Sequence, residues 1–228
     1  MGPVIAETLG LPVSVASHVD AMAGAELLLG ARRASQQSTS LYVYARETVG
    51  YALSIGGRVH SPASGPGTIA GLPAQSDLLG GTGQLESTVS DEAVLIAARK
   101  QRIVPADGPA STMAAVLRSA RQGNDKALAL LGERARVLGE AVALLRDMLN
   151  PDDLVVGGQA FTEYPEGMSL VEAAYRARSV LPARDVRVTS FGNRVQEAGA
   201  GVVSLGGIYA DPIGAMRRAI ARRPEASA

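Results

Sequence analysis

The sequence predicts an α/β fold. Segments with the apolar pattern of strands alternate along the chain with segments that have the pattern of helices, as in sheets covered by helices. The 228 residues are 46% hydrophobic, which is enough to bury a substantial core as one domain or as two closely joined lobes. Neither an internal repeat nor a low-complexity linker divides the chain.

The first elements are predicted to be a strand, a helix and an antiparallel meander. Residues 11–15 form a short β-like run, and Ser17 is placed to cap a helix that extends through Gly30. The meander comprises strands at 39–45 and 49–55, a turn at Gly56–Gly57, and a third run at 58–60.

The middle of the chain is predicted to be a long ordered loop followed by helices. Residues 61–83 are dense in glycine, proline, serine and alanine, which favours a loop over a regular element. Apolar residues at helical spacing then predict helices at 86–100 and 110–121. The clearest periodicity covers residues 125–149 and predicts a long core helix.

The C-terminal part continues the alternation of strands and helices. Asn150–Pro151 ends the long helix, and a buried strand at 154–156 leads into Gly157–Gly158. The remaining predicted elements are a helix at 169–178, a strand at 186–189 and a final helix at 196–209.

Composition excludes several classes of function. The 22 basic residues equal the 22 acidic ones, so any contact with nucleic acid must come from a local patch or from a part outside these residues. The absence of cysteine excludes disulfides and cysteine zinc sites, and two histidines make a histidine metal site improbable.

No secretion signal or membrane span is recognised, so we expect a cytoplasmic protein without membrane contact. The basic pairs Arg217–Arg218 and Arg222–Arg223 have two interpretations, a contact with phosphate and, more commonly, a solvated helix end.

Three segments resemble parts of a known family in their order and spacing. Residues 15–21 with Glu26 resemble a V-E-N-D-V-N-A helix start. Residues 41–86 resemble a glycine-rich phosphate hairpin, a sugar loop and a zinc-bearing G-C-L-E turn. Residues 138–158 resemble a helix and a nucleotide-side strand. Together they resemble the ROK family (repressor, open reading frame, kinase).

This resemblance implies the actin-like, ribonuclease-H-like α/β fold of sugar kinases, mainly its C-terminal lobe. Residues 1–228 would form one sugar-kinase-like domain, with residues 1–20 and the final helix near the boundary between lobes. Neither the family's first phosphate loop nor a DNA-binding winged helix is expected within these residues.

At the position of the family's catalytic aspartate this chain has His18, and Ser17 replaces the sugar-binding asparagine. A sugar kinase needs a carboxylate to accept the proton of the attacking hydroxyl. We therefore expect no catalytic residue, with His18 packing or capping at a helix start. Ser17, His18 and Glu86 remain candidates for ligand binding.

The phosphate hairpin departs from the family pattern as well. Its G-T-G-I-G sequence is here residues 46–50, in which arginine and glutamate replace two glycines whose backbone amides approach phosphates. Glu47 would add negative charge beside a polyphosphate, so we expect neither ATP binding in the usual pose nor any other cofactor.

The sugar loop and the zinc turn have also lost their polar groups. Residues 66–71 lack the glutamate and histidine of the family's A-G-E-I-G-H pattern, and the zinc cysteines correspond to Asp77, Leu79 and Gln84. Leu79 has no donor atom, so no metal is expected.

Two retained features have alternative interpretations. Glu86 belongs to the family's sugar-contacting set, but a carboxylate is also favoured at a helix N-terminus. Gly157–Gly158 is a candidate nucleotide-side turn, or only a tight turn between a strand and a helix.

These departures favour a non-catalytic effector-binding and oligomerisation domain of a ROK-family transcriptional regulator. It would bind a sugar or sugar-phosphate effector, form a homodimer or higher homo-oligomer, and reach DNA only through a winged helix outside this chain. Two alternatives stay open. One is an active ATP-dependent sugar or amino-sugar kinase, and the other is a purely structural module that dimerises through the helix at 125–149.

Overall fold

A five-stranded mixed sheet lies at the centre of the computed structural model, which describes residues 2–11, 13–30 and 38–221. Its strand order is β3-β2-β1-β4-β5. β1 pairs antiparallel with β2 and parallel with β4, β3 extends the antiparallel side, and β5 the parallel side. The strands are β1 Thr39–Ala45, β2 Val49–Ile55, β3 Arg58–Val59, β4 Asp153–Gly157 and β5 Val186–Val188.

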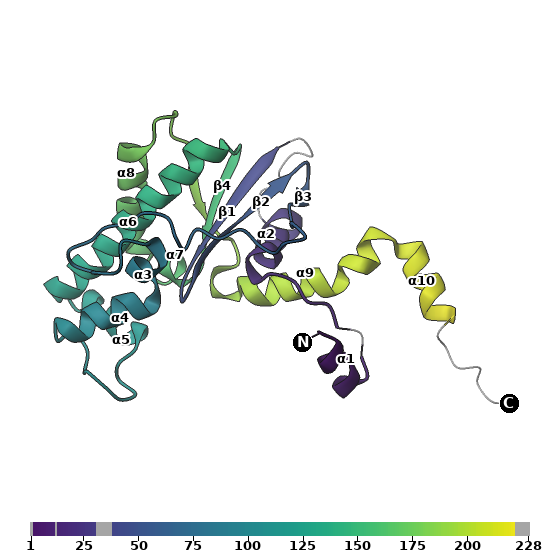
Figure 1. Cartoon of the computed structure of the whole chain (residues 1–228), viewed down its shortest axis with the longest axis horizontal. Coiled ribbons are helices and arrows are strands. Elements are labelled where there is room, and N and C mark those ends of the chain that lie inside the picture. The colour runs from purple at the N-terminus through teal and green to yellow at the C-terminus, as the bar shows by residue number, and fades with distance from the viewer. Residues whose placement is uncertain (1, 12, 31–37, 222–228) are drawn as a thin grey trace.

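Helices cover both faces of the sheet (Figure 1). The two central strands alternate between the faces, since Leu41 and Val43 of β1 belong to one core cluster and Tyr42 and Tyr44 to another. α6 and α8 pack on the first face, and α2 and α9 pack together on the second. The helices of these two layers are α2 His18–Leu29, α3 Leu85–Val89, α6 Asp125–Leu149, α8 Met168–Arg178 and α9 Val195–Ala210.

A third core cluster holds α4 and α5 against the N-terminal half of α6. It is built from small and aliphatic side chains, including Val94, Leu117 and Leu130. The helices of this end are α4 Asp91–Lys100 and α5 Met113–Arg121; the other helical segments are α1 Gly2–Leu9, α7 Gln159–Thr162, α10 Pro212–Ala221 and the short 3-10 turns Pro165–Gly167 and Gly192–Arg194. Figure 1 shows α4 and α5 at one end of the molecule and α10 at the other.

Most predicted elements are confirmed. The helix after Ser17, the strands at 39–45 and 49–55 and the helix at 125–149 have the expected bounds. The predicted helix at 86–100 is two helices, because Ser90 adopts extended dihedrals and its hydroxyl accepts a hydrogen bond from the Ala93 N–H at 3.3 Å. The helix predicted from residue 110 begins later, after the Thr112 cap.

The strand predicted at 11–15 is wrong. Residues 13–17 have no regular structure and residues 14–16 are exposed, while Pro12 lies outside the described residues. A short β-like run needs a neighbouring strand to hold it, and the sheet ends at β3 and β5. The short helices α1 and α7 had no counterpart in the prediction, whereas Arg217–Arg218 of the predicted basic helix end belong to α10 and Arg222–Arg223 lie outside the described residues.

None of the helices within the described ranges combines the length and the apolar character that a membrane span requires.

Asp147, near the end of α6, fixes the loop that follows α8. Its carboxylate accepts hydrogen bonds from the Ser179 hydroxyl at 2.6 Å and from the N–H groups of Val180 and Leu181 at 2.7 and 3.2 Å. The Ser179 bond, followed by the Val180 bond, lowers the pKa of Asp147 below its ordinary value.

This lowered pKa predicts a stability that is lost in acid. Since the folded pKa is below the unfolded value of about 3.9, the contribution is complete above that value and disappears as the pH falls through the folded one. Asp147→Asn should lower the melting temperature at neutral pH and flatten its decline in acid. Thermal unfolding at a series of pH values measures this, with the exposed Asp107→Asn as control. Parallel acid declines in Asp147→Asn and the unmodified chain would contradict the prediction.

Candidate functional site

Four segments that carry predicted site residues meet at the start of β2. A methyl group added at Gly50 would lie 3.1 Å from Cγ2 of Val19, so the first turn of α2 packs directly on this glycine. On its other side Gly50 forms an isolated antiparallel bridge with Thr68 of the long loop. The neighbouring Val49 N–H donates to the Glu86 carboxylate at 3.0 Å. The hairpin thus joins α2, the loop and α3.

Ser17 and His18 lie at the start of α2. The Ser17 hydroxyl accepts a hydrogen bond from the Asp20 N–H at 3.4 Å, and Ser17 is the N-cap of the helix. The exposed His18 imidazole meets the Tyr44 ring edge to face, with 5.1 Å between centroids and 82° between planes. Both side chains therefore have local contacts, and one edge of His18 remains open to solvent.

A groove of about 530 Å³ opens beside His18. One wall is the segment before α2 with the first turn of that helix, and the other wall is α9. Its polar groups are the hydroxyls of Ser14 and Ser204, the His18 ring and the Gln196 amide; the other lining residues are Ala16, Ala21, Ala200 and Val203. Of the three predicted ligand residues, His18 lines this groove, whereas Ser17 caps α2 and Glu86 contacts the loop side of the hairpin.

The α9 wall was missed by sequence reasoning. The helix itself was expected, but Gln196 and Ser204 belong to no recognisable motif. A hydrogen bond of 3.5 Å from the Gln196 amide to the Tyr44 hydroxyl connects this wall to the central sheet.

The hairpin turn at residues 46–48 is closed by a backbone hydrogen bond, and its first two side chains form an ion pair. The Arg46 N–H donates to the Thr48 carbonyl at 3.0 Å, and the Arg46 guanidinium lies 3.5 Å from the Glu47 carboxylate. Burial raises the pKa of the neighbouring Tyr44 hydroxyl, and the positive charge of Arg46 opposes that shift.

A shallow pocket of about 20 Å³, open to solvent, lies between this hairpin and the turn after β4. Such a volume holds about one water molecule. Its walls include Arg46 and Tyr44 on the hairpin side; the other lining residues are Gly158, Gln159, Gly192, Asn193, Val195 and Gln196.

Gly157 and Gly158 permit the close approach of β4 to β1. A methyl group at Gly157 would overlap the Tyr42 hydroxyl. Gly158 has φ +90°, and a methyl group there would overlap the Ala45 carbonyl oxygen and lie 2.9 Å from the Tyr44 ring. The pair makes a tight turn into the short helix α7, beside the shallow pocket.

The residues aligned with the family's zinc cysteines lie in three different environments. Asp77 is exposed, Leu79 is buried in the α4–α6 core cluster, and Gln84 pairs with Pro73 just before α3. Within the described residues, no three histidine or acidic side chains are grouped so that they would hold a metal ion.

Arg134 of α6 lies beneath the hairpin and was not predicted from the sequence. The residue is only 4% exposed. Its guanidinium donates to the Asp91 carboxylate at 2.6 Å and to the carbonyls of Val89 and Arg46 at 2.8 and 3.4 Å. Burial lowers the pKa of Arg134, and the Asp91 charge opposes that effect. The hairpin, the α3–α4 junction and α6 are thereby held in one arrangement.

Glu26 is a second buried charged group, on α2. Its carboxylate accepts hydrogen bonds from the Thr189 hydroxyl and from the Ser190 N–H at 2.8 Å, which fixes the end of β5 to α2. Burial raises the pKa of nearby Tyr42, and the negative charge of Glu26 adds to the rise. Because α9 follows this turn, the contact also sets the position of the groove wall.

Comparison with known proteins agrees with this architecture. Residues 3–204 match the ROK family. Transcriptional regulators of Mycobacterium tuberculosis and Mycobacterium bovis are 72% identical to the chain over 226 residues, which cover 96% of the chain and 52% of each regulator. The chain therefore spans about half the length of the curated relatives it matches.

Solved structures give the same result at the level of fold. A ROK family glucokinase from Streptomyces griseus, in complex with glucose and AMPPNP, superposes with a TM-score of 0.75 at 20% identity, over 90% of this chain and 71% of the glucokinase. A ROK hexokinase from Thermus thermophilus gives 0.72 at 26%, over 89% and 70%. A ROK family transcriptional regulator, a homologue of the E. coli MLC protein, gives 0.69 at 23%, over 89% and 54%. The expected fold is therefore confirmed as that of ROK sugar kinases and regulators, and the chain belongs to the ROK family.

Proposed function

We propose that this chain is the effector-binding and oligomerisation domain of a ROK-family transcriptional regulator, and that it does not catalyse phosphoryl transfer. The longer protein would contact its DNA target sequence through a winged helix outside these residues. The 72% identity to named transcriptional regulators supports the regulatory assignment.

The observation that carries the non-catalytic part is the ion pair of Arg46 and Glu47 at the hairpin turn. Phosphoryl transfer requires backbone amides and cations placed around a polyphosphate. Here the Arg46 side chain is ion-paired with Glu47, and a shallow pocket of about 20 Å³ lies between the hairpin and Gly158. The Glu47 carboxylate would repel a polyphosphate at this turn, whereas the His18 groove of about 530 Å³ has room for a small polar molecule.

The groove favours a sugar or sugar-phosphate effector. Its hydroxyls, imidazole and amide both donate and accept hydrogen bonds, which suits ligands that are rich in hydroxyl groups. Alanine and valine side chains between them provide apolar contact for the carbon face of a ring. Glu26 and its partners hold the turn before α9 against α2. A ligand between the two helices would therefore change their spacing by moving α9 about this fixed turn.

The two histidines of the chain provide a matched test. A thermal-shift screen over sugars and sugar phosphates should find a ligand that raises the melting temperature, since saturation at 100 Kd adds about 2.7 kcal/mol. His18→Ala should weaken that ligand about tenfold or more. His60→Ala changes an exposed histidine outside the groove and should bind it normally.

Two results would overturn the proposal. The first is an absence of stabilisation by every sugar and sugar phosphate. The second is ATP-dependent phosphorylation of a sugar that disappears in His18→Ala, because it would make the chain a kinase. Calorimetry with a non-hydrolysable ATP analogue should detect no binding if the proposal holds.

The oligomerisation part is supported by exposed apolar surface on α2 and α9. Leu28 and Leu29 at the end of α2 lie beside a groove of about 720 Å³ that is lined mainly by apolar residues of α9, including Leu205 and Tyr209. The apolar stripe of α6, by contrast, is buried within the chain. Light scattering should give a homodimer or larger species that Leu29→Glu dissociates, and a monomer at high concentration would contradict this part.

A further inference from the structure

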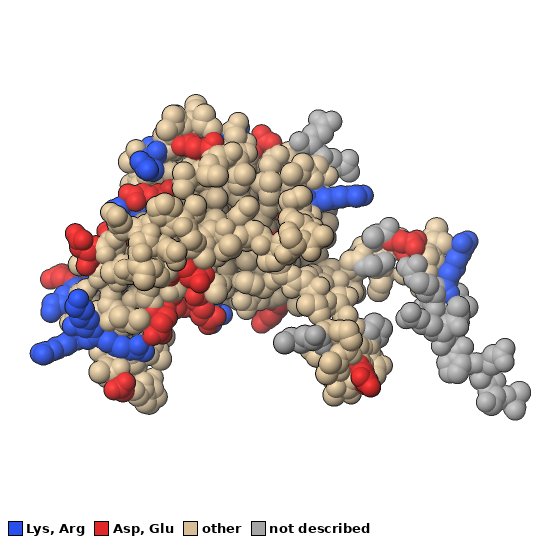
Figure 2. Space-filling view, in the orientation of Figure 1, with Lys and Arg blue, Asp and Glu red and all other residues tan. Residues whose placement is uncertain are grey.

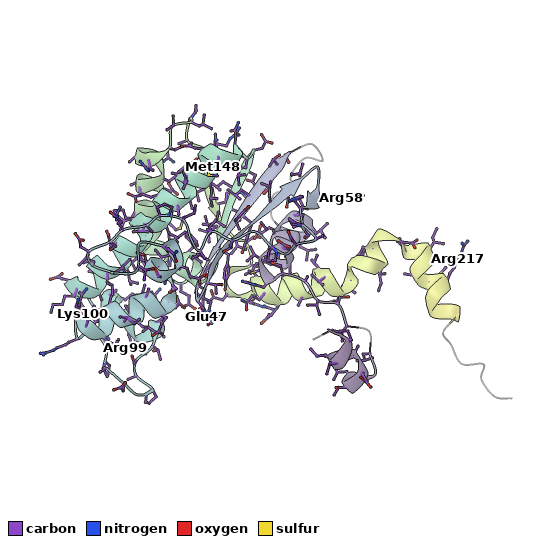
Figure 3. All side chains as sticks on the ribbon, viewed as in Figure 1. Glu47, Arg58, Arg99, Lys100, Met148 and Arg217 are labelled. Carbon is purple, nitrogen blue, oxygen red and sulfur yellow. The ribbon has the colours of Figure 1, made fainter. Side chains whose placement is uncertain are left out.

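One end of the molecule has a charge balance unlike that of the whole chain. Residues 99–126, which include the C-terminal ends of α4 and α5 and the start of α6, contain two carboxylates, Asp107 and Asp125. Figure 2 shows blue side chains gathered over this end, and Figure 3 shows Arg99 and Lys100 there. The six cations of the segment are Arg99, Lys100, Arg102, Arg118, Arg121 and Lys126.

Two of these cations are used inside the molecule. Arg99 pairs with Glu92 at 3.2 Å, and Arg121 pairs with Glu166 at 3.4 Å. The other four are exposed and, among the described residues, form no ion pair with a carboxylate. We call Lys100, Arg102, Arg118 and Lys126 the basic end.

Arg102 carries a side chain at a backbone position where glycine is favoured. Arg102 follows the last turn of α4 and adopts the left-handed conformation, with φ 59°. Two backbone hydrogen bonds close this helix end, from the Arg102 N–H to the Arg99 carbonyl and from the Ile103 N–H to the Ala98 carbonyl. α5 ends in the same hydrogen-bond pattern, but with Gly123 at φ 85°. Glycine is the favoured residue at this position, because a side chain there is strained.

Lys126 is also placed against the local preference. It lies in the first turn of α6, where the helix dipole favours negative charge. Lys100 and Arg118, by contrast, lie in the last turns of their helices, where cations are favoured. Helix electrostatics thus explain two members of the basic end and leave Arg102 and Lys126 unexplained.

We propose that the basic end contacts the phosphate backbone of duplex DNA without reading its sequence. This rests on the proposed function, because a domain of a DNA-binding regulator is held close to a duplex by the rest of its protein. Four exposed cations without carboxylate partners, on three helix ends, match a surface of repeated negative charge. The binding would add affinity and orientation to the longer protein, and its specificity would come from elsewhere.

Fluorescence anisotropy of a random-sequence duplex tests this on the chain itself. Binding should weaken with salt, and the double variant Lys100→Glu/Lys126→Glu should weaken it about tenfold or more and lower the salt slope by about 2. Arg58→Glu, which replaces an exposed cation on β3, makes one such charge reversal elsewhere, half the charge change of the double variant, and should leave binding near that of the unmodified chain.

Arg102→Gly separates DNA contact from a structural role. It should weaken duplex binding and lower the salt slope by about 1, while raising the urea midpoint because the left-handed strain is relieved. If Arg102 had only a structural role, Arg102→Gly would not combine higher stability with weaker duplex binding.

Three outcomes would overturn the inference: no duplex binding at low salt, equal binding and salt slope in the double variant, or tighter binding to a polyglutamate peptide than to the duplex. The last would assign the surface to an acidic protein. None of these outcomes bears on the sugar screen or on ATP binding, so failure here leaves the proposed function intact. Conversely, if the sugar screen finds no ligand, the duplex affinity and its salt dependence still test the DNA contact.

Discussion

Arg134→Met is expected to lower the free energy of unfolding by about 3–5 kcal/mol. The substitution keeps much of the side-chain volume of a residue that is 4% exposed but removes its charge. Asp91, whose side chain is 14% exposed, would then be a carboxylate with its cation removed, and the Val89 and Arg46 carbonyls would lose a donor. The large effect comes from a mostly buried carboxylate that has lost its cation and from the donor lost at each carbonyl, although the Arg46 carbonyl keeps a hydrogen bond from the Asp91 N–H at 2.9 Å.

Equilibrium urea unfolding measures this effect against a control on the same helix. Arg136 pairs with Glu133 at 2.8 Å and with Glu140 at 2.5 Å, but its side chain is 40% exposed. Arg136→Met should therefore cost about 1 kcal/mol or less. The double variant Arg134→Met/Asp91→Asn should lose less than the sum of its two single changes, because each single change leaves the other group unpaired. Similar losses for Arg134→Met and Arg136→Met would contradict the assigned role.

Gly158→Ala is expected to destabilise the fold by about 3 kcal/mol or more. A side chain is disfavoured at φ +90°, and the added methyl group would overlap the Ala45 carbonyl oxygen. Ala45 is the last residue of the central strand β1, so the turn after β4 would have to move away from the end of β1. The loss should appear both as a lower urea midpoint and as a lower melting temperature.

Gly201 of α9 provides the control for this substitution. A methyl group there would meet no atom within 4 Å, and the residue has helical dihedrals. Gly201→Ala should raise stability by up to about 1 kcal/mol through helix propensity. If Gly158→Ala were as stable as Gly201→Ala, the turn after β4 would not be the close approach described above.

The sequence predicted best those elements whose pattern is set by burial. β1 and β2 are bounded by turns and contribute to a core, and α6 has an uninterrupted apolar stripe. The break between α3 and α4 was missed although Ser90 is followed by Asp91 and Glu92, a recognisable helix start. The strand predicted at 11–15 failed because local β character cannot supply a pairing partner.

Part of the candidate site was accessible from the sequence. Ser17 and His18 were placed at a helix start by capping and by family resemblance, and His18 lines the groove, while the binding of a ligand there stays a prediction. Gln196 and Ser204 face His18 only because the turn fixed by Glu26 brings α9 against α2. Such contacts join residues far apart in the chain, and no local pattern contains them.

The two outermost strands of the sheet are its shortest, with two residues in β3 and three in β5. An incoming strand would find few unpaired backbone groups there, and the exposed Arg58 at the first position of β3 would have to be accommodated. Strand addition, the common route to amyloid-like aggregation and to continuous intermolecular sheets, is therefore disfavoured at both edges. Copies of this chain that associate would do so through helices, whose side-chain contacts can be rearranged without breaking a ladder of backbone hydrogen bonds.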